Sequence, residues 1–251
     1  MSPATKRGVT DNAETETYKD AATSPKRQKG DKKAEHSYVV HYFNVRAKAE
    51  IIRLVLAYSG VVWSDELTHS FADWLPNKET TPFGQLPVLV EHEDGQEVFR
   101  LAQSNAIVRY LSRKHGLVPA LPRHEALADS IFESVCDLET SWSRWNYEKD
   151  VATKAKLLDT LYDEKLASFL KYNEKHLAKN GNNGHFVGQH RTLADLYAFS
   201  VIERMEQDKE PRLEKHMKAH PAMHKLVESV RNDPKLQSYF HGTRCPVNFN
   251  P

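Results

Sequence analysis

Two segments of the sequence place polar side chains where an anion could bind. Gln103 and Ser104 come directly before the apolar periodicity of residues 105–115, so we expect them at the N-terminus of a helix. Free N–H groups and the helix dipole favour negative charge there. Tyr42 ends an aromatic and β-branched segment, residues 38–43, and its hydroxyl can donate a hydrogen bond. The strand alone would make Tyr42 one more strand aromatic, so its role depends on its surroundings.

Three histidines are spaced as if to form a metal-binding helix face. His216, His220 and His224 follow each other at four-residue intervals. Pro221 interrupts that helix, and no carboxylate or thiol ligand stands with the histidines. The sequence therefore predicts no metal site and no cofactor.

The cysteine content indicates a reducing compartment. Cys136 and Cys245 are too few for a disulfide framework in a chain of 251 residues. Cys136 falls in a helical segment, and we interpret it as a core residue rather than a nucleophile.

The composition is that of an ordinary soluble globular protein, with 39% hydrophobic and 27% charged residues. A net charge of +1 gives no general field that would recruit nucleic acid or a membrane. No apolar run approaches a membrane span or a secretory signal, so we expect a cytoplasmic protein. Residues 1–36 contain no Leu, Ile, Phe or Trp and predict a disordered tail. Its basic residues 25–33 resemble a nuclear-localisation patch, although such patches are common by chance in polar tails.

The elements that position these side chains can be predicted from the periodicity of apolar residues, which divides the chain into two domains. Residues 37–117 predict a compact α/β domain with a mixed sheet, and residues 123–245 are almost wholly helical. In the first domain we expect strands at 38–43, 61–68, 85–91 and 98–101, helices at 47–59 and 105–115, and an irregular connection at 69–84. In the second we expect helices at 124–150, 151–178, 192–207, 221–232 and 234–240.

Four motifs in this order resemble those of cytosolic glutathione transferases. Residues 42–50 (YFNVRAKAE) resemble the opening signature of the alpha, mu, pi and sigma group. Residues 74–89, with their Trp, Lys and Pro-Phe-Gly-Gln-Leu-Pro spacing, look like the second signature, and residues 103–111 like the third. The Thr-x-x-Asp box that ends at Asp195 resembles the capping box of the helical domain. The sigma class is the most similar, and the match covers everything after the tail.

The resemblance implies a thioredoxin-like N-terminal domain, a four-stranded mixed sheet with helices, followed by an all-helical domain. It also implies an enzyme that conjugates the glutathione thiolate to hydrophobic electrophiles in detoxification. A free thiol has a pKa near ~8.5, so the enzyme must favour the thiolate. Lowering that pKa by ~2 units needs about 2.7 kcal/mol, which one aimed hydrogen-bond donor can supply. The resemblance makes Tyr42 that catalytic donor.

The same resemblance assigns further residues to glutathione. Leu86 would pair its backbone with the ligand, next to a cis Pro87, and Gln103 with Ser104 would bind the γ-glutamyl carboxylate. The full expected set is Tyr42, Lys48, Trp74, Lys78, Gln85, Leu86, Pro87, Gln103, Ser104 and Asp137. Within it, Trp74 and Lys78 would hold the glycine end, and Asp137 would reach the γ-glutamyl amine of a partner subunit. The second-substrate candidates are Phe43, Arg46, Trp142 and Trp145, of which Arg46 also reads as structural.

The chain departs from the motif at two positions. Lys48 stands where the family often has an arginine, and Ala47 replaces a glycine. Lysine carries the same positive charge as arginine but lacks the planar guanidinium group. These departures leave two alternatives open, a non-catalytic glutathione-binding or structural protein and a glutathione-dependent isomerase of the prostaglandin type. The resemblance also implies a homodimer. Phe83 would either insert into the partner subunit as an aromatic key or form part of a flat polar interface.

Overall fold

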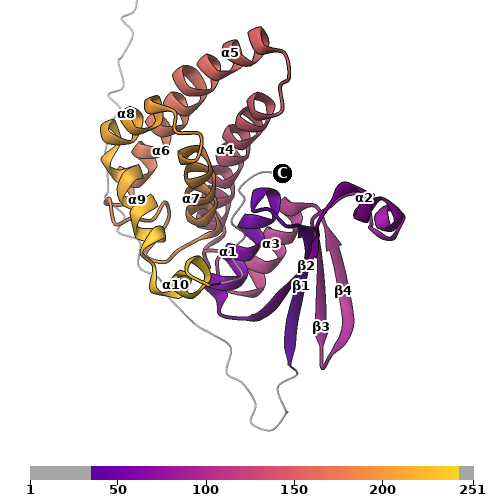
Figure 1. The fold of residues 1–251 in the computed structure, drawn as a ribbon. Helices are drawn as coiled ribbons and strands as arrows, with labels where there is room; N and C mark the ends of the chain where they lie inside the picture. Colours follow the sequence, from indigo (N-terminus) through magenta and orange to yellow (C-terminus); the bar gives the residue numbers. More distant parts are fainter. Residues whose placement is uncertain (1–34, 243–251) are drawn as a thin grey trace, which may run out of the picture.

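The computed structural model describes residues 35–242, which form an α/β domain followed by a helical domain (Figure 1). The strands are β1 (His36–Phe43), β2 (Val62–Thr68), β3 (Val88–Glu93) and β4 (Gln96–Ala102). The helices of this domain are α1 (Glu50–Ser59) and α3 (Ser104–Lys114), with the short η1 (Ala47–Ala49), α2 (Phe71–Trp74) and η2 (Leu75–Thr80).

The four strands form one mixed sheet in the order β2-β1-β3-β4. β1 runs parallel to β2 and antiparallel to β3, as a β-α-β unit followed by a hairpin requires. Tyr38, Val40 and Tyr42 alternate along β1 and are buried on one face of the sheet, the face that α1 and α3 cover in Figure 1. Tyr42 therefore lies near the end of β1, one of the two central strands, with its side chain on the buried face of the sheet.

The second domain is a bundle in which one helix is buried on all sides. Nearly every residue of α7 (Leu193–Glu206) is buried, including polar ones, so this helix forms the centre of the domain. The other helices of this domain, of which α4 and α9 pack most closely on α7, are α4 (Pro122–Asn146), α5 (Val151–Asp159), the π-helix η3 (Thr160–Leu166), α6 (Ala167–Lys179), α8 (Pro211–Ala219), α9 (Pro221–Arg231) and α10 (Pro234–Phe240). α7 also contacts α1 and α3, so it connects the two domains.

A capping box fixes the beginning of α7, as the Thr-x-x-Asp pattern predicts. The buried Asp195 carboxylate accepts hydrogen bonds from the backbone N–H of Thr192 at 2.7 Å and of Phe186 at 2.9 Å. The second bond also ties the glycine-rich loop at 180–190 to the helix. Burial raises the pKa of Asp195 to about 6, against the lowering effect of these N–H donors.

The structure differs from the expected elements in four places. A helix that we did not expect, α8, begins at Pro211, where the Glu210 side chain caps it. The connection expected to be irregular contains α2 and η2, and the helix expected at 151–178 passes through the π-turn η3. His36, assigned to the tail, is the first residue of β1 because it pairs with Glu93 across the sheet. Residues 1–34 of the tail, with the basic patch, and Cys245 lie outside the described residues.

Among residues 35–242, no helix is both long and apolar enough to cross a membrane.

Candidate active site

A cavity of about 500 Å³ opens where β1, β3 and α3 meet, and most of the residues expected to bind glutathione line it. Its lining is formed by Phe43, Lys48, Trp74, Gln85, Leu86, Pro87, Gln103, Ser104 and Asn105. These residues come from four separate stretches of the α/β domain, which the sheet brings together at one edge. Asn105, the one lining residue that we did not expect, follows Ser104 directly in α3.

The Tyr42 hydroxyl lies beside this cavity and is held by the chain that follows β1. Its oxygen accepts a hydrogen bond from the backbone N–H of Lys48 at 3.3 Å. Only 7% of the residue is exposed, and this burial raises the pKa of Tyr42 above its ordinary value, while the Lys48 N–H acts in the opposite direction. The phenol therefore keeps its proton at neutral pH and is available as a hydrogen-bond donor.

Aromatic rings in mutual contact extend from Tyr42 along one side of the cavity. The Phe43 ring meets the Tyr42 ring edge-on at 5.7 Å and the Trp74 ring at 6.0 Å. The Trp74 indole N–H is buried and has no hydrogen-bond partner within the described part of the chain. A buried donor without a partner is costly, so a ligand acceptor would stabilise this position. Lys78 packs on the same ring, with Nζ 5.8 Å from its centroid.

The opposite side of the cavity presents the beginning of α3. Gln103 has a φ of +71°, a conformation that a residue with a side chain adopts only where its surroundings impose it. Its amide donates to the Gln85 side-chain oxygen at 3.2 Å, so the two glutamines are held together. The Leu86–Pro87 peptide is cis, as the resemblance implies.

The Lys48 ammonium points across to the helical domain. Its Nζ lies 2.5 Å from a carboxylate oxygen of Glu139 on α4, and the lysine side chain remains 45% exposed. The Glu139 carboxylate is buried and also accepts from Tyr197 and Arg204. Burial acts to raise the pKa of Glu139, but the charges of Arg204 and Lys48 outweigh it and hold the pKa below its usual value.

Several expected site residues lie outside this cavity. Asp137 lines a separate cavity of about 610 Å³ between α4, η3 and α6. Trp142 is buried in the helical domain, where its indole donates to Asp208 at 2.7 Å. Arg46 is buried and bonded to Glu50 and Glu203. We therefore leave Trp142 and Arg46 out of a second-substrate pocket, because their side chains are engaged in the interior.

Two further aromatic residues stand at the end of α4. Trp145 is half-buried and packs edge-on against Trp142 at 6.2 Å. Tyr147, which the sequence did not single out, is exposed just after α4 and adds a small contribution that raises the pKa of Tyr42, after the larger effect of burial. No local motif marks Tyr147, since its place follows only from the packing of α4 against the first domain.

Cys136 does not have the surroundings of a reactive thiol. Burial, with a smaller contribution from Glu133 and Glu139, raises its pKa to about 12. A nucleophilic cysteine needs the opposite shift, so the structure supports reading Cys136 as an inert residue of the interior.

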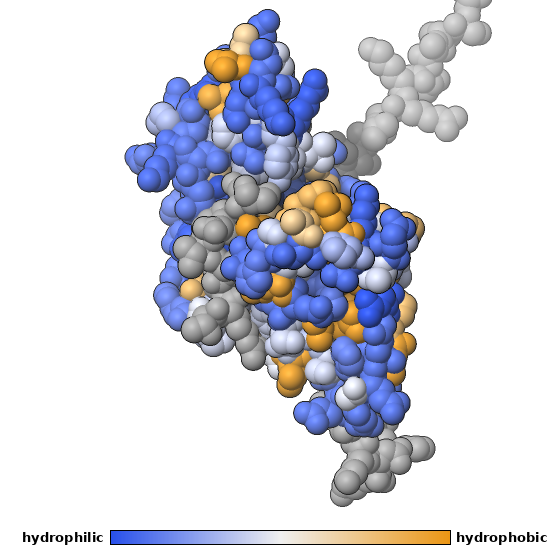
Figure 2. Space-filling view, turned by 45° about the vertical axis from the view of Figure 1, so that its right-hand side comes forward, coloured by the Kyte–Doolittle hydropathy of each residue, from blue (hydrophilic) through white to orange (hydrophobic). Residues whose placement is uncertain are grey.

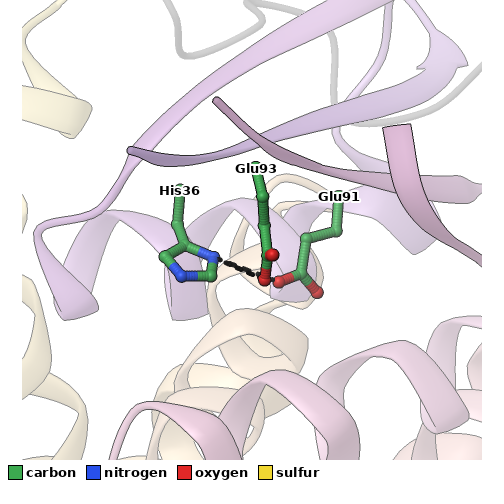
Figure 3. Close-up of side chains that lie close together, drawn as sticks. All are labelled: His36, Glu91 and Glu93. Carbon is green, nitrogen blue, oxygen red and sulfur yellow. Dashed lines mark ion pairs between the residues drawn. The ribbon is translucent and has the colours of Figure 1, made fainter. Parts of the chain in front are cut away.

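A separate cluster of titratable residues lies at the beginning of β1, far along the strand from Tyr42. Figure 3 shows the His36 ring directed at the carboxylates of Glu91 and Glu93, at 3.5 and 3.4 Å from its Nδ1. Within the described residues, this is the group whose ligand atoms come close enough for a metal. The Lys114 ammonium and the Tyr110 hydroxyl already bond Glu91. We interpret the cluster as an ion-pair network that joins the sheet to α3.

The fold is therefore a thioredoxin-like α/β domain joined to an all-helical domain, with a ligand cavity beside Tyr42. Two family models match the chain: the N-terminal domain of glutathione S-transferases at residues 38–113 and their C-terminal domain at residues 136–242. The glutathione S-transferase of Plasmodium falciparum is 33% identical over 80% of this chain and 93% of its own length. The chain belongs to the glutathione S-transferase family.

Other relatives carry the name of a different activity. The hematopoietic prostaglandin D synthase of Gallus gallus is 37% identical over 64% of this chain and 75% of its own length. The solved structure of prostaglandin synthase D of Nilaparvata lugens superposes with a TM-score of 0.71 at 30% identity and covers 84% of this chain.

Proposed function

We propose that this protein is a glutathione transferase that conjugates the glutathione thiolate to hydrophobic electrophiles. The observation that carries the proposal is the buried hydroxyl of Tyr42, which accepts a hydrogen bond from the Lys48 backbone N–H beside the cavity. A phenol O–H directed at sulfur stabilises the thiolate more than the thiol, which is the difference that catalysis requires.

Glutathione matches the polar groups of the cavity from end to end. The γ-glutamyl carboxylate would meet the N-terminus of α3 at Gln103 and Ser104, and the cysteinyl backbone would pair with Leu86. At the glycine end, the unpartnered indole N–H of Trp74 and the ammonium of Lys78 would bind the carboxylate. The cysteinyl sulfur then lies near Tyr42, where it attacks the electrophilic carbon and displaces the leaving group.

The electrophile would bind on the side of the cavity that faces the helical domain. Trp145 and Tyr147 offer aromatic surface there, and Phe43 separates this side from the glycine end. Aromatic surface with one polar donor suits hydrophobic electrophiles, and this supports a role in detoxification.

We also propose that the protein is a homodimer. The exposed large apolar side chains of the α/β domain include Phe83, which is 65% exposed, together with Val98 and Phe99 on the edge strand. On the face shown in Figure 2, hydrophobic surface gathers mainly over this domain, whereas the helical domain is largely hydrophilic. The cavity that contains Asp137 would receive the Phe83 ring of a partner, and this would bring Asp137 toward the partner's glutathione.

The test is turnover of a chlorodinitrobenzene-type electrophile with glutathione by the wild-type protein and by Tyr42→Phe. Removing one aimed donor of this kind costs about 10²–10³ in rate, so we expect a loss of that order in the variant. Undiminished turnover in a folded Tyr42→Phe protein would contradict the mechanism. Retention on glutathione-agarose without turnover of any electrophile would favour a non-catalytic binder instead.

A glutathione-dependent isomerase is the second candidate, favoured by the similarity to the prostaglandin D synthases of Gallus gallus and Nilaparvata lugens. It would use the same thiolate to open a prostaglandin endoperoxide and would regenerate glutathione at the end of each cycle. Product analysis with an endoperoxide separates the two functions, because conjugation consumes glutathione and isomerisation does not.

A further inference from the structure

One peptide unit beside the active site is bonded at both ends, by residues of different domains. The peptide that joins Ala47 to Lys48 donates its N–H to the Tyr42 hydroxyl oxygen at 3.3 Å. Its carbonyl accepts a hydrogen bond from Nη2 of Arg204, on α7, at 2.8 Å. Because a peptide unit is planar, the guanidinium on the carbonyl fixes the direction of the N–H that reaches Tyr42.

The turn that contains this peptide is strained and needs support. Ala47 has a φ of +30°, in the half of conformational space that side chains disfavour. Such a conformation costs of the order of 1–3 kcal/mol and persists only where the surrounding structure imposes it. A glycine would be the usual choice at this position, so the support comes from side chains that bond the turn. Nη1 of Arg53, on α1, donates to the Val45 carbonyl at 2.8 Å, and Arg204 bonds the Ala47 carbonyl from the helical domain.

Arg204 is itself held rigidly. It is 5% exposed, its Nη1 donates to Glu139 at 2.9 Å, and its guanidinium lies 5.1 Å from the centroid of the Trp142 ring. Glu139 also accepts from Tyr197 and from the Lys48 side chain, so the carboxylate is fixed by α7 and by the loop after β1 together. The indole N–H of the same Trp142 donates to Asp208 at 2.7 Å, and the charge of Arg204 acts to lower the pKa of that carboxyl.

We propose that Arg204 is a positioning residue for thiolate formation, acting on the Tyr42 hydroxyl through the Ala47–Lys48 peptide. This rests on the proposed function of Tyr42 and extends it to the helical domain. The guanidinium polarises the carbonyl, the peptide N–H becomes a stronger donor, and the phenol that accepts from it donates more strongly to sulfur. Consecutive hydrogen bonds strengthen one another in this way in a low-dielectric interior.

A purely structural role makes a different prediction. If Arg204 only joins the two domains through its ion pair with Glu139, its removal lowers the melting temperature and leaves the acidity of bound glutathione unchanged. The readout that separates the two roles is the pKa of the bound thiol, followed by the ultraviolet absorbance of the thiolate as pH is raised.

The first experiment measures this pKa in the wild-type protein, in Arg204→Met and in Arg191→Met. Arg191 is a matched control, because it is also a buried arginine of the helical domain, ion-paired with Asp233 away from Tyr42. We expect Arg204→Met to raise the thiol pKa by about 0.5–1 unit, which is about a 3- to 10-fold decrease in the acid dissociation constant of the bound thiol. Arg191→Met should lose stability without this shift. Equal thiol pKa values in wild type and Arg204→Met would overturn the proposal.

A second pair of variants decides the question if Arg204→Met does not fold. Glu139→Gln keeps an oxygen that can accept from Arg204 but removes the negative charge that offsets the guanidinium. In a Lys48→Met background, where no released ammonium can act on sulfur, adding Glu139→Gln should lower the thiol pKa. An unchanged or raised value would overturn the proposal. A wild-type protein that binds glutathione without lowering its thiol pKa would instead refute the proposed function, which keeps the two failures distinguishable.

Discussion

The backbone N–H of Lys48 donates to the hydroxyl oxygen of Tyr42 over 3.3 Å, while the ammonium of the same lysine is turned away toward Glu139. Lys48 thus serves the candidate catalytic tyrosine through its backbone. Its side chain, which stands where the family often has an arginine, is engaged with the helical domain. The two roles can be separated by substitution, since every residue but proline supplies the N–H.

The Lys48 side chain should set part of the thiolate stabilisation. Lys48→Arg introduces a planar guanidinium, which can bind Glu139 through one N–H group while another N–H group approaches the sulfur. We therefore expect the pKa of the bound thiol to fall by about 0.5 unit. Lys48→Met should raise it by a similar amount, because a nearby positive charge is lost. Thiolate absorbance against pH measures both changes, and identical titrations of the three proteins would show that the ammonium does not act on sulfur.

The capping carboxylate of Asp195 should dominate the stability of the helical domain. Asp195→Ala leaves the buried N–H groups of Thr192 and Phe186 without acceptors, and we expect a loss of about 2–4 kcal/mol in the free energy of unfolding. Asp150, which caps the exposed beginning of α5 by accepting from Thr153, provides the control. Asp150→Ala should cost about 1 kcal/mol, as exposed caps do. Equal losses in urea titrations would refute the special role of the buried cap.

Glu203 should give stability a measurable pH dependence. Burial and the charge of Glu50 raise its pKa to about 7, against Arg46, from the ordinary value of 4.5. The folded protein therefore holds this proton over a range where the unfolded chain has released it, so the stability contributed by the group falls as pH rises from about 4.5 to about 7. Glu203→Gln cannot titrate, and its melting temperature should fall less than that of wild type across this window. The prediction would be contradicted if the melting temperatures of the two proteins changed equally with pH across this window.

Phe83 should be needed for dimerisation. Phe83→Ser removes an exposed ring that would fill the partner's cavity beside Asp137, and we expect the dimer dissociation constant to rise at least about 30-fold, as for an aromatic anchor. Phe71 is similarly exposed, on α2, and Phe71→Ser is the control. Sedimentation equilibrium measures both variants. A dimer unaffected by Phe83→Ser would place the interface elsewhere.

Local signals in the sequence predicted most of the fold. The strand ending at Phe43, the hairpin around Asp94-Gly95 and the capping box at Asp195 are each encoded within a few residues, and all three are present. α8 escaped prediction because its beginning depends on a Glu210 side-chain cap, which is an uncommon capping residue. We placed the domain boundary after residue 36 from composition alone. Composition cannot show that His36 pairs with Glu93 across the sheet.

The residues of the candidate active site could be predicted only where they are adjacent in the sequence. Gln103 with Ser104, and Leu86 with Pro87, lie together in the chain and together in the cavity. The bonds from Glu139 and Arg204 to the turn after β1 join residues 91 and 157 positions apart, so no local pattern could reveal them. The burial of Trp142 had the same origin, because its partner Asp208 lies 66 positions further along the chain, in the turn after α7.

The pKa of the glutathione thiol bound to Tyr42→Phe tests the central claim most directly. Tyr38→Phe is the matched control, because Tyr38 is also a buried tyrosine of β1, but its hydroxyl bonds His115 and not the chain beside the cavity. We predict a thiol pKa of about 6.5 in the wild-type protein and in Tyr38→Phe, and a return to about 8.5 in Tyr42→Phe. A bound thiol that titrates identically in Tyr42→Phe and wild type would contradict the account.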